Sequence, residues 1–88
     1  INKRNLNMKT IKYFSATWCG PCKAFKPVMN EIASEGYSVQ FIDVDHSQEV
    51  AVNYSVRSVP TVVIEENGIE VNRFTGAIPK SQVLERLM

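Results

Sequence analysis

Two cysteines separated by Gly20 and Pro21 constrain this chain more than any other feature. Bulky, β-favouring residues precede them over residues 10–16, and from Pro21 onward apolar residues recur every three or four positions, as on one face of a helix. Pro21 suits the first position of a helix, because it lacks an N–H that would have no intrahelical partner there. The pattern therefore predicts that Cys19 and Cys22 lie at a strand-to-helix junction.

This placement favours thiol–disulfide chemistry. Cysteines three positions apart at a helix start face the same side and are close enough for a disulfide. Free N–H groups and the positive end of the helix dipole favour a thiolate, and such sites lower the pKa of a cysteine to roughly 3.5–7.5. We expect Cys19, just outside the helix, to be the exposed nucleophile, with Gly20 and Pro21 leaving it unscreened. Cys22, in the first turn, is the expected shielded, resolving thiol.

Metal binding is the competing use of a cysteine pair. A closed zinc site takes four ligands, typically Cys and His, and the chain contains two cysteines and one histidine, His46. His46 falls in a strand-to-helix turn that we expect to be distant, so a single chain is short of ligands, although two chains could share a site. Lys23 stands where covalent haem attachment requires histidine. We therefore expect redox chemistry without a bound metal or other cofactor.

The rest of the chain predicts an α/β fold. Strands are expected at 10–16, 39–44, 61–64 and 69–74, with helices at 21–36, 48–54 and from 79 onward. The second strand is apolar enough to be buried on both faces, and Asn67-Gly68 between two β-type runs predicts a hairpin. The order β-α-β-α-β-β-α implies one parallel pair plus an antiparallel hairpin, in a four-stranded mixed sheet flanked by helices.

Length and charge restrict the number of domains and the kinds of partner that we expect for this chain. A chain of 88 residues is expected to form one domain, and its net charge of +1, with both signs interspersed, offers no basic patch for nucleic acid. No apolar run reaches the roughly 18 residues that a membrane span needs. Residues 1–7 are polar and basic and do not resemble a secretory signal. We expect them to be a non-native or disordered leader, Met8 to be the native start, and 8–88 to form a single, monomeric, cytoplasmic domain.

Three segments carry a resemblance to a known family. Residues 18–23, Trp-Cys-Gly-Pro-Cys-Lys, resemble the active-site signature of thioredoxins. Residues 59–61, Val-Pro-Thr, resemble the family's cis-proline loop, 74–76, Phe-Thr-Gly, resemble its glycine loop, and Pro27 matches its helix-kinking proline. The resemblance covers about residues 10–87 and lacks the family's usual N-terminal strand and helix. The chain is thus similar to a minimal, glutaredoxin-sized member with a thioredoxin-like fold.

The resemblance implies a protein-disulfide reductase. Cys19 would attack the disulfide of a target protein, Cys22 would resolve the mixed disulfide, and thioredoxin reductase or a glutathione system would restore the dithiol. It also implies a cis bond at Val59–Pro60, beside which an extended target segment would pair with the loop backbone. The substrate groove would comprise Trp18, Gly20, Pro21, Val59, Pro60, Gly76 and Ala77. The alternatives are a glutaredoxin-like protein recycled by glutathione and a non-catalytic binding module with the same fold.

One pair of positions departs from the family pattern. Many thioredoxins hold a buried carboxylate in the strand before the motif, with a lysine beside it, as a proton acceptor for the resolving cysteine. The matching positions here are Tyr13 and Phe41. Neither is a base at neutral pH, since the pKa of tyrosine is about 10. We therefore expect Cys22 to lose its proton through water or by coupling to the other thiolate, with slower resolution.

Overall fold

The structure, a computed structural model, describes residues 9–88. Its elements are β1 (Lys9–Ser15), α2 (Gly20–Ser34), β2 (Ser38–Asp43), α3 (Gln48–Asn53), β3 (Thr61–Glu66), β4 (Ile69–Thr75) and α4 (Lys80–Arg86). The predicted order of strands and helices is confirmed. The expectation about residues 1–7 and the start at Met8 lies outside the described residues.

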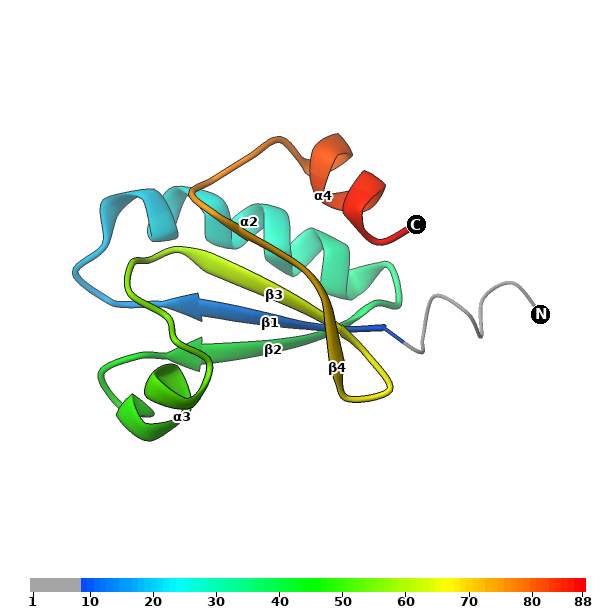
Figure 1. The fold of residues 1–88 in the computed structure, drawn as a ribbon. Helices are drawn as coiled ribbons and strands as arrows, with labels where there is room; N and C mark the ends of the chain where they lie inside the picture. Colours follow the sequence, from blue (N-terminus) through cyan, green and yellow to red (C-terminus); the bar gives the residue numbers. More distant parts are fainter. Residues whose placement is uncertain (1–8) are drawn as a thin grey trace.

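The four strands form one mixed sheet in the order β2-β1-β3-β4. β1 runs parallel to β2 and antiparallel to β3, and β3 and β4 form the predicted antiparallel hairpin. Asn67 and Gly68 both take positive φ angles, 56° and 82°, as the tight turn of a hairpin requires. Helices α2 and α4 lie on one side of the sheet and α3 lies on the other (Figure 1).

The main core lies between the sheet and the helices α2 and α4. Alternate residues of a strand face opposite sides of a sheet, so Ile11 and Tyr13 enter this core while Phe14 joins a smaller cluster on the α3 side. The buried members of the main core are Ile11, Tyr13, Phe25, Met29, Ile32, Val62, Ile64, Phe74, Val83 and Leu87. This packing fixes the end of β1 and the start of α2 against each other.

Helix α2 is amphipathic and supplies one wall of the main core. Its buried side chains, Cys22, Phe25, Met29 and Ile32, recur at the three- and four-residue spacing seen in the sequence. The helix begins with a proline in its first turn and also carries Pro27 in its interior. Its buried face extends to Cys22, so this cysteine belongs both to the core and to the helix start.

The burial predicted for the second strand is wrong. We expected residues 39–44 to be buried on both faces, but no residue of β2 (Ser38–Asp43) is fully buried and Phe41 is 43% exposed. β2 is an edge strand that pairs only with β1, so one of its sides has no neighbouring strand. Helix α3, six residues long, covers only part of the adjoining sheet face.

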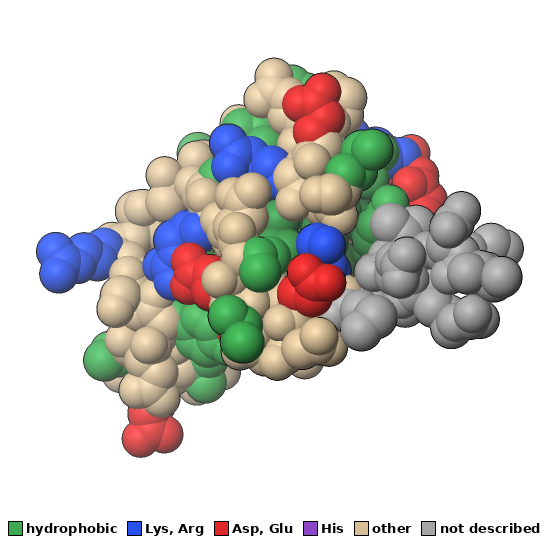
Figure 2. All heavy atoms as spheres, turned by 45° about the vertical axis from the view of Figure 1, so that its right-hand side comes forward, with side chains coloured by type: hydrophobic (Ala, Val, Ile, Leu, Met, Phe, Trp, Pro, Cys, Tyr) green, Lys and Arg blue, Asp and Glu red, His purple; other side chains and the backbone are tan. Residues whose placement is uncertain are grey.

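The described surface carries charges of both signs. Figure 2 shows lysine or arginine side chains next to aspartate or glutamate side chains, rather than a face of one sign. Ion pairs such as Lys9–Glu66 and Arg73–Glu70 account for part of this mixing. None of the helices within residues 9–88 has the length and apolar character needed to cross a membrane.

Candidate active site

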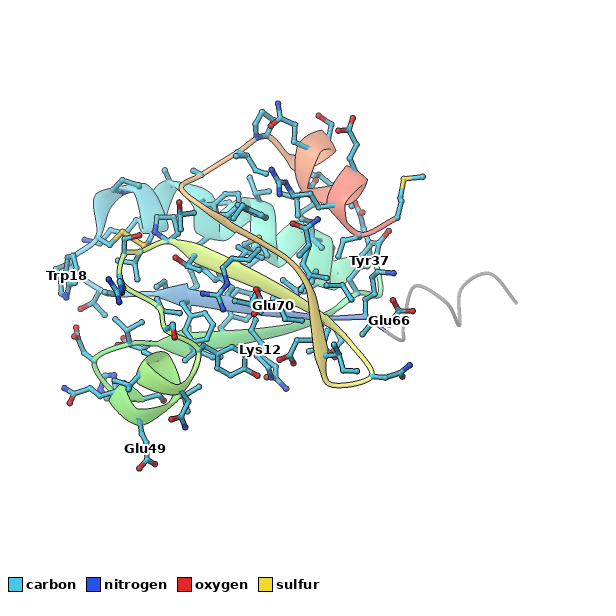
Figure 3. All side chains as sticks on the ribbon, in the orientation of Figure 1. Lys12, Trp18, Tyr37, Glu49, Glu66 and Glu70 are labelled. Atoms are coloured by element: carbon cyan, nitrogen blue, oxygen red, sulfur yellow. A yellow bond between two sulfur atoms is a disulfide. The ribbon has the colours of Figure 1, made fainter. Side chains whose placement is uncertain are left out.

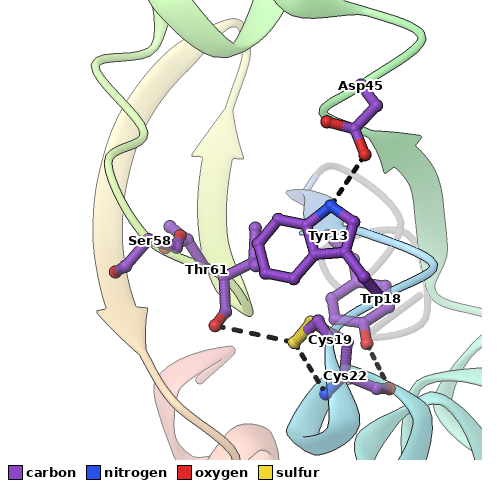
Figure 4. Close-up of a disulfide and its surroundings, with 8 residues drawn as sticks. Tyr13, Trp18, Cys19, Cys22, Asp45, Ser58 and Thr61 are labelled. Atoms are coloured by element: carbon purple, nitrogen blue, oxygen red, sulfur yellow. Dashed lines mark hydrogen bonds between the residues drawn. A yellow bond between two sulfur atoms is a disulfide. The ribbon is translucent and has the colours of Figure 1, made fainter.

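Cys19 and Cys22 form a disulfide at the start of α2, with their Cα atoms 5.2 Å apart. Cys19 is the N-cap residue of the helix, with an extended backbone (φ −90°, ψ 111°), and Cys22 lies in the first turn. The backbone N–H of Cys22 points at the Cys19 Sγ, 3.1 Å away (Figure 4). The Cys19 sulfur therefore occupies the place where capping oxygens accept from the first free N–H groups of a helix.

Both cysteines are covered, contrary to the expectation for Cys19. Its exposed fraction is 4% and that of Cys22 is 2%. Ala16 packs with the two cysteines, and Val44 and Val59 close over the same cluster from the loops after β2 and before β3. The exposed position predicted for Cys19 is wrong because side chains from these loops, which are remote in sequence, pack against the cysteine cluster. The two thiols thus differ in their place on the helix more than in their exposure.

The loop before β3 forms the wall beside Cys19. The Val59–Pro60 peptide bond is cis, as the sequence resemblance implies. The Val59 carbonyl oxygen lies 3.7 Å from the Cys19 Sγ. The Pro60 carbonyl accepts a hydrogen bond from the N–H of Gly76, 2.8 Å away, and Gly76 has a φ of +86° that favours glycine. The structure therefore ties the loop at 59–60 to the loop at 76–77.

Trp18 stands exposed at the rim of the site. Its side chain is 68% exposed and lies at the end of the molecule where α2 begins (Figure 3). The indole Nε1–H donates a hydrogen bond to the Asp45 carboxylate, 2.8 Å away (Figure 4). A hollow of about 130 Å³ adjoins the indole; it is lined by Trp18, Val44, Val56, Arg57, Ser58 and Val59.

The predicted groove residues fall into two groups. Gly20 and Pro21 are exposed at the helix start, beside Trp18 in the chain. Val59 packs against the cysteine cluster, and Pro60 and Gly76 are joined by the hydrogen bond between their loops, with Ala77 exposed next to them. Sequence reasoning missed Asp45, which lies 27 residues from the tryptophan it holds.

Tyr13 lies on the other side of the disulfide, against Cys22. Its hydroxyl donates a hydrogen bond to the Cys22 carbonyl oxygen, 2.8 Å away (Figure 4), and its side chain is 1% exposed. Burial raises the pKa of Tyr13, so the phenol is neutral at physiological pH. Its ring packs edge-on against Phe25 and Phe41, with centroids 5.8 and 5.7 Å away. The position where the family often has a carboxylate thus carries a neutral donor bound to the backbone of Cys22.

A cavity of about 350 Å³ opens beside Cys22. It is lined by Tyr13, Ser15, Ala16, Thr17, Cys22, Lys23, Lys26, Phe41 and Asp43. Sequence reasoning did not place Lys26 or Asp43 in the site, because they come from different elements and meet only in the folded chain. The cavity and the hollow beside Trp18 have separate lining residues: Cys22 lines the cavity, and Trp18, the neighbour of Cys19 in the chain, lines the hollow.

Asp43 is the carboxylate in the lining of the cavity, and the loop after β2 holds it. Its Oδ1 accepts hydrogen bonds from the backbone N–H groups of Asp45 and His46, at 2.8 and 3.3 Å. The hydrogen bond from Asp45 is the main cause that holds the pKa of Asp43 below its usual range, with a smaller effect from His46. Within residues 9–88, no three side chains of His, Cys, Asp or Glu gather as a metal site would need.

Comparisons with known proteins agree on one family. The family model for thioredoxin matches residues 3–88. A thioredoxin from Mycoplasmoides gallisepticum is 37% identical over 83 residues, covering 92% of this chain and 83% of that protein. A bifunctional thioredoxin reductase/thioredoxin from Mycobacterium leprae is 42% identical over 84 residues, covering 92% of this chain and 18% of that protein. The structure of a mutant thioredoxin from Halobacterium salinarum superposes with a TM-score of 0.87 at 32% identity, covering 98% and 77% of the two chains.

Proposed function

Because this chain belongs to the thioredoxin family and is a thiol–disulfide oxidoreductase, we propose that it reduces disulfides of target proteins with Cys19 as the nucleophile and Cys22 as the resolving thiol. The observation that carries this assignment is the position of Cys19 as the N-cap of α2.

The helix start supports Cys19 as the attacking sulfur. A thiolate at the N-terminus of a helix is stabilised by the dipole and by free N–H groups, and the thiolate is the nucleophile in disulfide exchange. The N–H of Cys22 already points at the Cys19 Sγ, 3.1 Å away. Cys22 lies inside the first turn and has its carbonyl tied to Tyr13, so it has less freedom to reach a separate protein.

The reaction takes place in two exchanges. The Cys19 thiolate attacks one sulfur of the target disulfide, forms a mixed disulfide, and releases the other target sulfur as a thiolate. Cys22 then loses its proton and attacks the Cys19 sulfur, which forms the Cys19–Cys22 bond and releases the second target thiolate. The target gains two electrons and the protein loses two, and the structure holds the oxidised product of this cycle.

The predicted groove residues, together with Asp45, support binding of an extended target segment. Trp18 offers an exposed indole whose orientation is held by Asp45, next to an apolar hollow. On the other side of Cys19, Gly76 has open space around its Cα, so a peptide backbone can approach closely. We propose that the target chain runs past Cys19 between Trp18 and the loops at 59–60 and 76–77.

A thioredoxin reductase is the proposed electron donor. The relative from Mycobacterium leprae carries both names in one protein, which supports a partnership between the two activities. A dithiol donor also needs a compartment in which thiols stay reduced, and we therefore include a cytoplasmic location in the proposal.

NADPH-coupled reduction of insulin disulfides tests the proposal. The reduced protein is recycled by thioredoxin reductase in one assay and by glutathione with its reductase in a second. We expect turnover with thioredoxin reductase, none for Cys19→Ser, and a trapped mixed disulfide for Cys22→Ser. Turnover only with glutathione would assign the glutaredoxin-like alternative. If a Cys19→Ser/Cys22→Ser variant still binds target proteins but gives no turnover, the protein is instead the non-catalytic binding module.

A further inference from the structure

We infer that Lys26 is a positioning residue for the resolving step: its ammonium group, through the cavity that it shares with Cys22, favours the Cys22 thiolate in place of a carboxylate base. This inference rests on the proposed role of Cys22. It explains how the buried Cys22 thiol loses its proton when the strand before the cysteine motif carries Tyr13 in place of a carboxylate base.

Cys22 lies in surroundings that disfavour a charged thiolate. The residue is 2% exposed, and burial in apolar surroundings raises the pKa of a thiol. Some feature must offset this effect if Cys22 is to attack at neutral pH. Tyr13 does not act as a base here, because it is itself buried and its hydroxyl donates a hydrogen bond to the Cys22 carbonyl.

Residues of both charge signs line the cavity. Two of them, Lys23 and Lys26, come from α2 and carry positive charge; Asp43, from β2, carries negative charge. From β1 the lining titratable group is the neutral Tyr13. Arg57 and the tryptophan-bound Asp45 belong to the separate recess beside Trp18 or to its rim. Within residues 9–88 the cavity beside Cys22 thus has more positive than negative charge in its lining.

Lys26 and Asp43 act on Cys22 from different elements. Lys26 follows Cys22 by four positions, so both lie on the same face of α2. Asp43 is turned to the loop after β2, whose N–H groups at Asp45 and His46 bind one of its oxygens. A carboxylate held as an anion in this way is a weak base. Asp43 therefore acts on Cys22 as a nearby negative charge, opposite in effect to Lys26.

The proton leaves by way of the same cavity. Lys23 and Lys26 are exposed residues, so the cavity that they line opens to solvent, and water can reach the side of Cys22. When Cys22 attacks the Cys19 sulfur, its proton passes to water and the second target sulfur departs as a thiolate. The positive charge of Lys26 lowers the free-energy cost of the Cys22 thiolate before the attack.

The test uses opposite charge changes on the full chain. In a Cys19→Ser background, the Cys22 thiol is titrated by its ultraviolet thiolate absorbance, after subtraction of the same titration of Cys19→Ser/Cys22→Ser. We expect Lys26→Gln to raise the pKa of Cys22 by about half a unit, less than the roughly 1–3 units of a close pair because Lys26 is solvated. Asp43→Asn is expected to lower it, and Lys26→Arg, which keeps the charge, to leave it unchanged.

Single-turnover kinetics test the consequence for the reaction. At an assay pH below the pKa measured for the Cys22 thiol, a rise of half a unit in that pKa corresponds to about threefold less thiolate. Lys26→Gln should therefore slow release of the second target thiol about threefold and leave the release of the first unchanged. A pKa of Cys22 that does not move, or that falls in Lys26→Gln, overturns the inference. So does slower resolution in Asp43→Asn, which would make Asp43 the proton acceptor. Failure of Cys22→Ser to trap a mixed disulfide would instead contradict the proposed function.

Discussion

The indole N–H of Trp18 is bound to the carboxylate of Asp45 at 2.8 Å, although 27 residues separate them in the chain. The bond links the start of α2 to the loop after β2. Since the indole is 68% exposed, little packing holds it, and this one polar contact sets the direction in which its ring faces solvent.

Asp45→Ala should weaken recognition of target proteins without changing the chemistry of Cys19. Loss of one hydrogen bond of about 0.5–1.5 kcal/mol predicts a KM for a protein disulfide that rises roughly two- to tenfold. The rate of attack on a small aromatic disulfide should stay at the wild-type value. Steady-state kinetics on the two substrates measure the difference, and Asp45→Asn, which keeps an oxygen acceptor, is the matched control. An unchanged KM in Asp45→Ala would show that Trp18 does not need this contact.

Tyr13→Phe should destabilise the fold by about 1 kcal/mol. The variant keeps the aromatic ring in the core and removes only the donor to the Cys22 carbonyl, so the loss is that of one buried hydrogen bond. Urea denaturation of the oxidised protein measures the free energy of unfolding. Tyr37→Phe, at the opposite end of the molecule from Trp18 (Figure 3), is the control and should change it by less than about 0.5 kcal/mol. Equal losses in both variants would contradict the prediction.

Gly76→Ala should cost about 1–2 kcal/mol of stability through its backbone alone. Gly76 has a φ of +86°, which an L-residue with a Cβ adopts only with strain, and a Cβ added there would meet nothing within 4 Å. Gly20→Ala is the matched control, because that position has the same open space without a positive φ. Thermal unfolding of the two variants measures the contrast. If Gly20→Ala lowers the melting temperature as much, backbone strain is not the cause.

Tyr54 should make stability depend on pH in the alkaline range. Its hydroxyl donates to Glu65 at 2.6 Å, and this hydrogen bond, burial and the charge of Glu65 raise the pKa of Tyr54 to about 12. The unfolded value is about 10. The folded state therefore holds this proton more tightly, and the stabilisation is complete below about pH 10 and lost as the pH rises through about 12.

A comparison with Tyr54→Phe isolates this effect from that of the other tyrosines. The free energy of unfolding of the wild type, minus that of Tyr54→Phe, should be constant up to about pH 10 and then shrink. Chemical denaturation at a series of pH values provides both quantities. A difference that stays the same across the alkaline range would rule out the hydrogen bond to Glu65 as the source.

The fold was predictable from the sequence because its local signals agree with one another. The change of period at Pro21 marked the start of α2, and Asn67-Gly68 marked the hairpin, each through the conformations that these residues favour. The burial of β2 was not predictable in this way. An apolar strand has the same sequence pattern whether it lies inside a sheet or at its edge. The exposure of β2 follows from its place at the edge, where it pairs only with β1.

The sequence was sufficient to predict which two cysteines pair, but not the burial and charge of their surroundings. The spacing of Cys19 and Cys22 determines that they can pair, and the structure contains that disulfide. The covering of Cys19 by Val59, and the cavity shared by Lys26 and Asp43, arise from contacts between elements distant in the chain. Such contacts leave no periodic signal, so exposure and charge around the two thiols required the structure.

The Cys19 Sγ caps α2 and, in the proposed reaction, is also the atom that changes bonding. The amide of Cys22 points at this sulfur, which in that reaction is in turn a thiolate, part of a mixed disulfide and part of the internal disulfide. A thiolate accepts a hydrogen bond more strongly than a sulfur bonded to another sulfur does. The first turn of the helix is therefore held more tightly before attack than after it, while Phe25, Met29 and Ile32 anchor the later turns throughout. The amide signal of residue 22 should consequently follow the redox state of the protein, and amides deeper in the helix should not.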